Sequence, residues 1–540
     1  MKFSPAAARP CAPALFLVLA FALGGLRAPL PWLAFGVLFL AWFVRSGAVT
    51  FSVNRAAGLF FLWVGAAALF SPEPAASLAV FARYAVLGLL FYSAAGDGSG
   101  EGAWLGAVSL LGAACAAVLL FQRFYSPAPA GLLGLNPNYS AVFCAAAFPA
   151  ALLAVTGGGG RKEKIYYSLL ALLLAGGLLA SGSRGALLAA FAASAAGLGA
   201  LRRWRPLAAL AIACLAAAAF LPVQAWEGLL KFSDPRAFAR PQLWASAYRA
   251  AAASPLLGWG PGLFGEVFER FKFPYFDGVS FYGHSTLHAH SELLNLAAEA
   301  GFPAAVLFLW AAGAALLTGG VKKLPLKLCA LAALLQGGVD MIFYSGAVSL
   351  LFWGSLGFSS GSSGDGKISW RARGALAALC LAGLAIGAAR LYIPGGEERF
   401  LEASGAAYEA GGGQALGLAL RRHSALNNPL NAFIAEAEGR ALAAAGNRDA
   451  AEAAFQRALA LEPFFSRARL GLAAVYGAGG RRAEACAELG LSARRPPAPP
   501  KNEYQLALLL QDGAAFERLN KDLCAKKKTG SAIAPGRKTP

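Results

Sequence analysis

Charged residues are scarce in this sequence of 540 residues. They make up 14% of the chain and hydrophobic residues make up 58%, whereas soluble domains contain about 25% and about 45–50%. A mean hydropathy of +0.55 excludes a soluble enzyme. Acidic residues are the rarer sign, with 28 Asp and Glu against 47 Lys and Arg, for a net charge of +19. In a membrane protein this excess does not require nucleic acid, because basic residues gather in cytoplasmic loops.

The motifs of several common chemistries are also absent. The sequence has no CxxC pair, no Cys/His cluster, no Walker loop, no GxGxxG opening a helix after a strand and no GxSxG elbow. Six of the eight cysteines lie in or beside apolar runs, where we interpret them as small core hydrophobes: Cys11, Cys115, Cys144, Cys214, Cys329 and Cys380. Cys486 and Cys524 lie outside the apolar part, and the sequence leaves open whether they pair.

Long apolar runs dominate what is present. A helix that crosses a bilayer needs about 20 apolar residues. The runs predict an all-α polytopic membrane protein of 12–13 transmembrane helices, near 11–26, 31–44, 56–71, 75–95, 103–121, 138–155, 165–181, 185–201, 206–223, 302–319, 326–344, 346–359 and 374–393. The first run, preceded by Lys2 and Arg9, resembles a signal peptide. Another apolar run follows closely, so we predict a retained membrane helix.

Basic residues alternate between the short loops. With a cytoplasmic N-terminus, the inside loops hold Arg45 with Arg55, Arg161 with Lys162 and Lys164, Arg202 with Arg203 and Arg205, Lys322 with Lys323 and Lys327, and Lys367 with Arg371 and Arg373. One inside loop, 96–102, carries no positive charge and breaks the pattern. The short outside loops hold little more than Arg27, Arg123 and Arg184. This asymmetry predicts that the long connection 224–301 lies outside, as does everything after the last helix.

The composition changes after residue 395. Pro429, Pro463 and Pro497 are 34 residues apart, which is the period of a tetratricopeptide repeat. We therefore divide the chain into a multi-spanning domain at 1–360, a basic linker with the last transmembrane helix at 361–395, α-helical tetratricopeptide-like repeats at 396–500, and a basic tail at 501–540. The end of the tail is rich in Lys, Gly, Ser and Pro and is predicted to be disordered.

Ionisable groups at membrane depth are candidates for function because burying them is costly. Arg83 lies inside the predicted helix 75–95, and Asp340 lies towards the outer half of the predicted helix 326–344. For each, a structural ion pair or a side chain reaching for the interface is an equal alternative. At the outer surface, Arg184 follows the tight polar turn 181–183, where a guanidinium suits a phosphate. An interfacial anchor is the alternative.

Three of the four histidines fall within seven residues of the outside loop: His284, His288 and His290. This spacing can bind zinc, but no Cys and no acidic partner spacing accompanies it. We favour a single His as general base over a metal site. A polar loop residue without function is the remaining alternative.

Taken in order, these motifs resemble the O-antigen ligase/polymerase superfamily of bacterial inner-membrane glycosyltransferases. The resemblance covers roughly residues 10–360 and rests on 183–186, Arg240 to Trp244, the 255–262 sequence PLLGWGPG, the 288–294 sequence HAHSELL running into 299–301, and the 136–138 sequence NPN. A periplasmic tetratricopeptide tail is similar to what some members carry.

The resemblance implies a GT-C-like helical fold that transfers a glycan from undecaprenyl diphosphate to an acceptor hydroxyl at the periplasmic face. The acceptor is lipid A core in ligases, another glycan in polymerases and a protein hydroxyl in protein-glycosylating relatives. By resemblance, Arg184 and Arg240 hold the diphosphate and His290 is the catalytic base, without metal, cofactor or nucleic acid. Ser291 and Leu293 replace the family's Asn and aromatic residue, which leaves His288 as a substitute base.

The chemistry agrees with that assignment. A diphosphate leaves with negative charge, which fixed cations stabilise, and a positioned imidazole activates a sugar hydroxyl by about 10²–10⁴-fold. Displacement opposite the diphosphate predicts inversion. A polysaccharide transporter or flippase is an alternative of another class, in which Arg83 and Asp340 line a path and the repeats recruit partners. The sequence leaves the acceptor and the glycan open.

Overall fold

The computed structural model describes residues 12–46, 54–97, 99–126, 129–134, 136–220, 240–274, 285–360, 368–392, 396–427, 429–492 and 513–524. The predicted disordered tail from 525, the loop residues 224–239 and His284 lie outside the described residues. Regular elements within these ranges are all helical, as predicted. The chain divides into two compact units, one of residues 1–271 with 286–396 and the other of residues 272–285 with 397–540.

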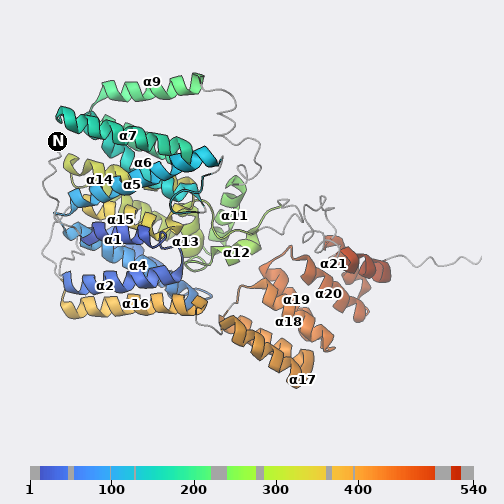
Figure 1. The fold of residues 1–540 in the computed structure, drawn as a ribbon. Coiled ribbons are helices and arrows are strands. Elements are labelled where there is room, and N and C mark those ends of the chain that lie inside the picture. The colour runs from blue at the N-terminus through green and yellow to red at the C-terminus, as the bar shows by residue number, and fades with distance from the viewer. Residues whose placement is uncertain are drawn as a thin grey trace, which may run out of the picture. The chain divides into compact units, whose positions relative to one another are not determined.

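The first unit is a bundle of apolar helices that run alongside one another (Figure 1). Its helices are α1 (Ala12–Ala22), α2 (Pro29–Ser46), α3 (Arg55–Leu69), α4 (Pro74–Gly96), α5 (Glu101–Tyr125), α6 (Pro137–Val155), α7 (Arg161–Ser181), α8 (Arg184–Ala200), α9 (Trp204–Phe220), α11 (Arg240–Ala253), α12 (Phe264–Phe271), α13 (Glu292–Leu317), α14 (Leu324–Val339), α15 (Gly346–Ser360) and α16 (Trp370–Tyr392), with 3₁₀ turns η2 (Val321–Lys323) and η3 (Ile342–Tyr344).

Six of these helices are long and apolar enough to cross a membrane: α4, α5, α6, α7, α13 and α16. Four shorter apolar helices, α1, α2, α3 and α8, accompany them. These helices make the first unit a multi-pass membrane domain, which confirms the coarse form of the prediction.

Two kinds of contact hold the bundle together. In the first kind, small residues let helices approach closely. A Cβ on Gly177 of α7, for example, would lie only 2.5 Å from the Cα of Ala116 on α5. Elsewhere aromatic rings fill the interior around Trp353 of α15, whose neighbours within ring contact are Phe60, Phe61, Phe91, Phe308 and Phe352.

Two predicted helices differ in their bounds. The helix predicted at 302–319 begins at Glu292, because α13 continues through a break at Gly301 (φ 83°). The helix predicted at 326–344 ends at Val339, after Gly337 and Gly338. Asp340 then adopts an extended backbone (φ −151°), so it lies at a helix end and not within a helix.

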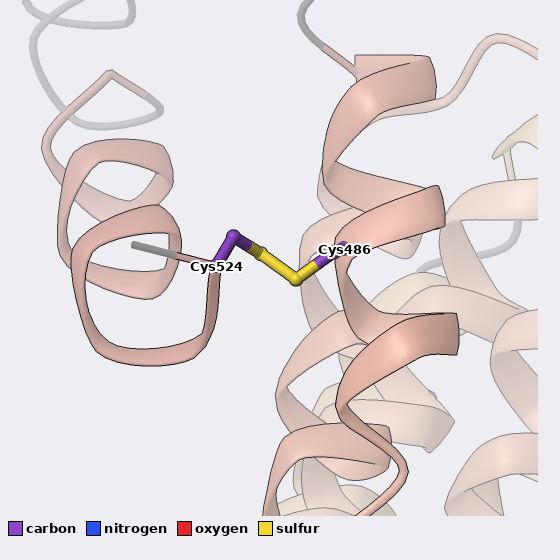
Figure 2. The surroundings of a disulfide bond; sticks show 2 residues. All are labelled: Cys486 and Cys524. Carbon is purple, nitrogen blue, oxygen red and sulfur yellow. A yellow bond between two sulfur atoms is a disulfide. The ribbon is translucent and has the colours of Figure 1, made fainter. Parts of the chain in front are cut away.

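The second unit consists of α17 (Gly396–Asn427), α18 (Ala432–Ala444), α19 (Arg448–Leu461), α20 (Ser466–Ala478), α21 (Arg482–Ser492) and η4 (Asn520–Cys524). Phe455 of α19 is buried at its core, where Gly439 and Gly471 leave room for the ring. Asn431 and Asn447 cap α18 and α19. A disulfide joins Cys486 of α21 to Cys524 of η4 (Figure 2), which answers the pairing question that the sequence left open.

Candidate functional site

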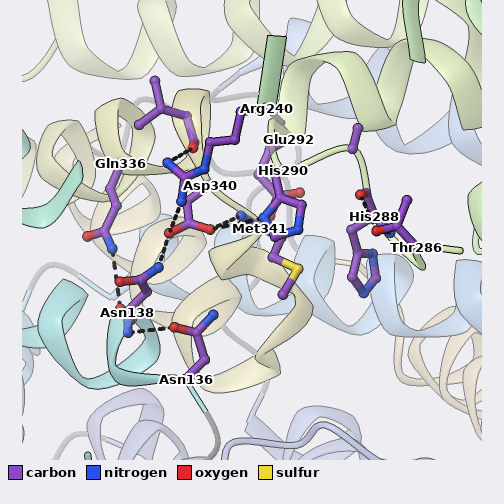
Figure 3. A network of polar contacts seen from close by, with 12 residues as sticks. Asn136, Asn138, Arg240, Thr286, His288, His290, Glu292, Gln336, Asp340 and Met341 are labelled. Carbon is purple, nitrogen blue, oxygen red and sulfur yellow. Dashed lines mark hydrogen bonds and ion pairs between the residues drawn. The ribbon is translucent and has the colours of Figure 1, made fainter. Parts of the chain in front are cut away.

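Helix ends at one end of the first unit converge on Asp340. They are the start of α6, the end of α14, the start of α11 and the residues leading into α13 (Figure 3). α11 and α12 lie beyond the ends of the long helices in Figure 1. The site is thus built from helix termini, where polar groups are tolerated more easily than inside an apolar helix.

Asp340 is the buried centre of the site. Its side chain is 3% exposed, yet both oxygens have partners. Oδ2 accepts a hydrogen bond from the carboxamide of Asn138, and Oδ1 accepts one from the backbone N–H of Met341 at 2.9 Å. Gln336 Nε2 donates to the backbone carbonyl of Asn138 at 3.3 Å. A buried carboxylate needs such partners, because leaving it unpaired would be costly.

Asn138 reaches Asp340 because of the way α6 begins. Asn136 is the N-cap, with its side chain accepting from the Asn138 N–H at 3.0 Å, and Pro137 occupies the first helical position. The 136–138 sequence NPN therefore starts the helix and directs the third residue at the carboxylate.

Arg240, the first residue of α11, approaches the same carboxylate. Its NH1 donates to the backbone carbonyl of Val339 at 3.1 Å, and its NH2 lies 3.9 Å from Asp340 Oδ2. The side chain of Arg240 is 29% exposed. The guanidinium is therefore held beside the carboxylate while part of the side chain remains exposed.

His290 approaches the other carboxylate oxygen. Its Nδ1 lies 3.7 Å from Asp340 Oδ1, an electrostatic contact too long for a hydrogen bond, and its side chain is 27% exposed. With Nδ1 directed at the carboxylate, Nε2 is the nitrogen left for a substrate. The structure thus places Arg240 and His290, which the resemblance assigns to one site, beside Asp340, which was predicted separately.

His288 has a different environment. Its ring packs against Tyr344, with the ring centroids 4.5 Å apart, and its Nε2 is buried without a hydrogen-bond partner in the described part of the chain. Burial, and secondarily the neighbouring His290, lowers the pKa of His288 to about 4. An imidazole with so low a pKa is a weak base, so the environment favours His290 for that role.

Arg184 begins α8 after a structured turn. Gly182 has φ 61°, the Ser181 hydroxyl accepts from the Ser183 N–H at 3.1 Å, and Ser183 caps the helix. The next residue, Gly185, packs on α14, where a Cβ would lie 3.3 Å from Val339. Since Val339 also accepts from Arg240, the turn places the start of α8 beside the same helix end.

Arg83, predicted at membrane depth, lies on α4 and interacts electrostatically with Tyr344, the residue whose ring packs on His288. Arg83 is therefore near Tyr344, and within the described part of the chain the ion-pair partners of Asp340 are Arg240 and His290.

The PLLGWGPG motif, which lies between α11 and α12, docks onto the break in α13. Trp259 and Gly260 donate backbone hydrogen bonds to Ala298 and Glu299 at 3.0 and 2.7 Å, and Phe302 donates to Pro255 at 2.9 Å. The Glu299 carboxylate accepts from the Phe264 N–H at 3.3 Å. These bonds satisfy backbone groups that the helix break frees, and they fix the loop that follows α11.

Within the described ranges no group of three His, Cys, Asp or Glu side chains could hold a metal ion. His284, the third histidine of the predicted cluster, lies outside those ranges.

With this geometry in place, the comparison with known families is informative. Residues 169–309 match the O-antigen ligase family model. The matched range contains Arg184, Arg240, His288 and His290 and ends before Asp340. No curated protein matches the chain. The match supports the resemblance drawn from the motifs, and in general terms it supports a ligase- or polymerase-type glycosyltransferase with a lipid-linked glycan donor and a glycan acceptor.

Sequence reasoning missed some of the site's residues. Gln336 and Glu292 were not singled out, although Glu292 accepts from the Phe343 N–H at 2.7 Å close to His290. The signal for Gln336 was its position as a polar residue inside an apolar run, four residues before Asp340. Contacts across more than a hundred residues, such as Asn138 with Asp340, leave no local sequence pattern.

Proposed function

We propose that the protein transfers a glycan from an undecaprenyl-diphosphate-linked donor to an acceptor hydroxyl, with inversion, at the periplasmic face of the bacterial inner membrane. In this proposal Arg184 and Arg240 hold the diphosphate and His290 is the general base. The single observation that carries the proposal is that Arg240 and His290 meet over one buried carboxylate, Asp340, with both side chains still partly exposed.

The chemistry follows from that geometry. Asp340 faces Nδ1 of His290, so the imidazole is oriented with Nε2 free to take the proton of the acceptor hydroxyl. The hydroxyl oxygen attacks the anomeric carbon, the bond to the diphosphate oxygen breaks, and the charge that develops on the diphosphate is stabilised by the guanidinium groups. Because the site lies at the ends of the membrane helices, the diphosphate head group can reach it while the lipid tail of the donor stays in the bilayer.

Two observations support the proposed orientation. Basic side chains hold the opposite end of the bundle, where Arg203 donates to Leu153 O and Thr156 Oγ1 at 2.8 and 2.7 Å, and Lys323 pairs with Glu101. Such residues favour the cytoplasmic side. The Cys486–Cys524 disulfide of the second unit is typical of an oxidising compartment.

We further propose that the shorter apolar helices also cross the membrane, for a total of 12–13 spans, and that residues 396–500 form tetratricopeptide-like repeats that engage a protein partner. The support for repeats is that α18 and α20 begin at residues 432 and 466, which is 34 apart. A reporter active only in the periplasm tests the topology. It should be active when fused near 260 and after 400 and silent near 163, 204 and 324. A reporter that is active at 204 and silent at 260 would contradict the proposed orientation.

The function is tested by deleting the gene and restoring the reaction. A deletion strain should accumulate lipid-linked glycan and lose the glycosylated acceptor. Purified protein added to a detergent extract of those membranes should then form the missing product, and the His290→Ala variant should not. Failure of the unaltered protein, or full activity of His290→Ala, would overturn the proposal.

The same strain distinguishes the members of the superfamily. Loss of all long-chain polysaccharide from the lipid anchor indicates a ligase, and a product with one glycan unit indicates a polymerase. A flippase needs no base in an outer loop, so its activity would survive replacement of His290.

A further inference from the structure

The backbone of His290 has an uncommon conformation. Its φ is +53°, in the left-handed region that residues other than glycine seldom adopt. This backbone conformation sets the direction in which the His290 side chain points, two residues before α13 begins. Something outside the residue must hold it, because an unrestrained chain would favour negative φ.

Two hydrogen bonds flank the residue and hold it. The indole N–H of Trp244 donates to the backbone carbonyl of His290 at 3.2 Å. On the other side, the N–H of Ala289 donates to the side-chain oxygen of Asn295 at 3.1 Å. The first bond restrains the peptide group that follows His290. The second restrains the peptide group between His288 and Ala289, one residue earlier, so the chain is held on both sides of the imidazole.

Trp244 is on the same helix as Arg240 and four residues later, so the two side chains leave α11 on one face. Arg240 reaches the end of α14, and Trp244 reaches His290. One helix therefore contacts both groups to which the proposed mechanism assigns chemistry.

We propose that Trp244 is a positioning residue for the base: its indole N–H holds His290 in the left-handed conformation that directs the imidazole at Asp340. This inference rests on the proposed function. Asn295 completes the restraint, and its own carboxamide bonds Glu299, which holds the loop before α12. Losing the indole N–H frees the His290 carbonyl and lets the imidazole leave Asp340.

The test is Trp244→Phe, which keeps an aromatic ring and removes the N–H. The matched control is Trp63→Phe, because the indole N–H of Trp63 likewise donates to a backbone carbonyl, that of Ala300 in α13 at 3.0 Å, ten residues after His290. Both full-length variants are purified in detergent and assayed with lipid-linked glycan and acceptor extracted from the deletion strain, with the lipid-linked glycan varied. A misplaced base slows the step but not binding, so Trp244→Phe should lower kcat about tenfold or more with KM changed less than about twofold. Trp63→Phe should keep kcat within about threefold.

Unchanged kcat in Trp244→Phe, a loss confined to KM, or an equal loss in Trp63→Phe would overturn the inference. If Trp244→Phe fails to accumulate, Asn295→Ala removes the second restraint and should lower kcat without raising KM. Unchanged kcat in that variant would also overturn it. His290→Ala distinguishes failure of the proposed function from failure of the positioning role. Full activity of His290→Ala would overturn the proposed function. An inactive His290→Ala together with a fully active Trp244→Phe would overturn only the positioning role of Trp244.

Discussion

The carboxamide of Asn138 donates a hydrogen bond to the carboxylate of Asp340, a residue 202 positions later in the chain. This contact joins the start of α6 to the end of α14 beneath the exposed parts of Arg240 and His290. Together with the bond from the Met341 N–H, it holds the carboxylate in one position, and the two basic side chains lie around that carboxylate.

Asp340→Asn should therefore lower activity about 10²-fold while the protein still accumulates in the membrane. The new carboxamide has the right size, but its NH₂ group would face either Asn138 or Met341, which are both donors, and the charge that attracts Arg240 and His290 is lost. Asp97→Asn is the matched control, since Asp97 accepts bonds within the opposite loop from Ser99 and Gly100. Equal activity of the two variants would show that the Asp340 charge has no role.

Arg240→Lys and Arg184→Lys keep a positive charge but lose the planar arrangement of donors. Each should lower glycan transfer about tenfold or more at unchanged abundance. Arg249→Lys is the control on the same helix, because Arg249 donates to Ser246 and Phe271 away from Asp340. Full activity in both test variants would mean that neither guanidinium binds the diphosphate.

His290→Gln should abolish transfer, whereas His288→Gln and His284→Ala should retain most of it. The reason is that, of the two histidines of this cluster that the structure describes, His290 is directed at Asp340 and His288 is packed on Tyr344. Purified enzyme should also remain active in excess chelator. Activity that is lost to the chelator and regained with zinc would replace the base mechanism with a metal site.

The lowered pKa of His288 predicts a pH-dependent stability. In the unfolded chain His titrates near its ordinary value of about 6.5, and in the folded protein His288 titrates at about 4. Between these values the unfolded state binds more protons than the folded state. The free energy of unfolding should therefore be highest above about pH 6.5 and fall as the pH drops towards 4. Thermal unfolding in detergent from pH 7 to 4.5 should show this fall, and a His288→Gln variant should reduce it. Identical pH dependence in both proteins would contradict the burial of this imidazole.

Gly301→Ala should destabilise the first unit by about 2–4 kcal/mol, because the residue has φ 83° and a Cβ there would lie 1.9 Å from the carbonyl oxygen of Leu256. Gly313→Ala on the same helix meets nothing within 4 Å and should be neutral or stabilising. The thermal midpoints of the two purified variants measure the difference. Similar midpoints would show that the loop docks on α13 more loosely than the structure has it.

Much of the fold could be predicted because a membrane helix is recognised from a run of apolar residues that are consecutive in the sequence. The run 165–181 is apolar enough to be recognised without its neighbours, and α7 is found there. The ends were less predictable where tertiary contacts decide them. α13 begins at Glu292, before the break at Gly301, because the 255–262 loop forms hydrogen bonds with the backbone groups at the break. A single sequence does not show that this loop contacts the helix there.

Only part of the site was predicted as a unit. Arg240 and His290 were predicted together because their motifs resemble those of the O-antigen ligase/polymerase superfamily. Asp340 was found as an isolated charge in an apolar segment, with no indication of its partners. Their convergence depends on how α6, α11 and α14 pack, which is set by contacts between residues far apart in the chain.

The bond between Cys486 and Cys524 closes a covalent loop of the chain within the second unit. A protease that cuts once at any residue between these two cysteines would sever the backbone but release nothing. The two fragments would migrate as one species on a denaturing gel and separate only after a thiol is added. Protease resistance of this part of the protein, measured under reducing conditions alone, would therefore understate how long its C-terminal segment stays attached.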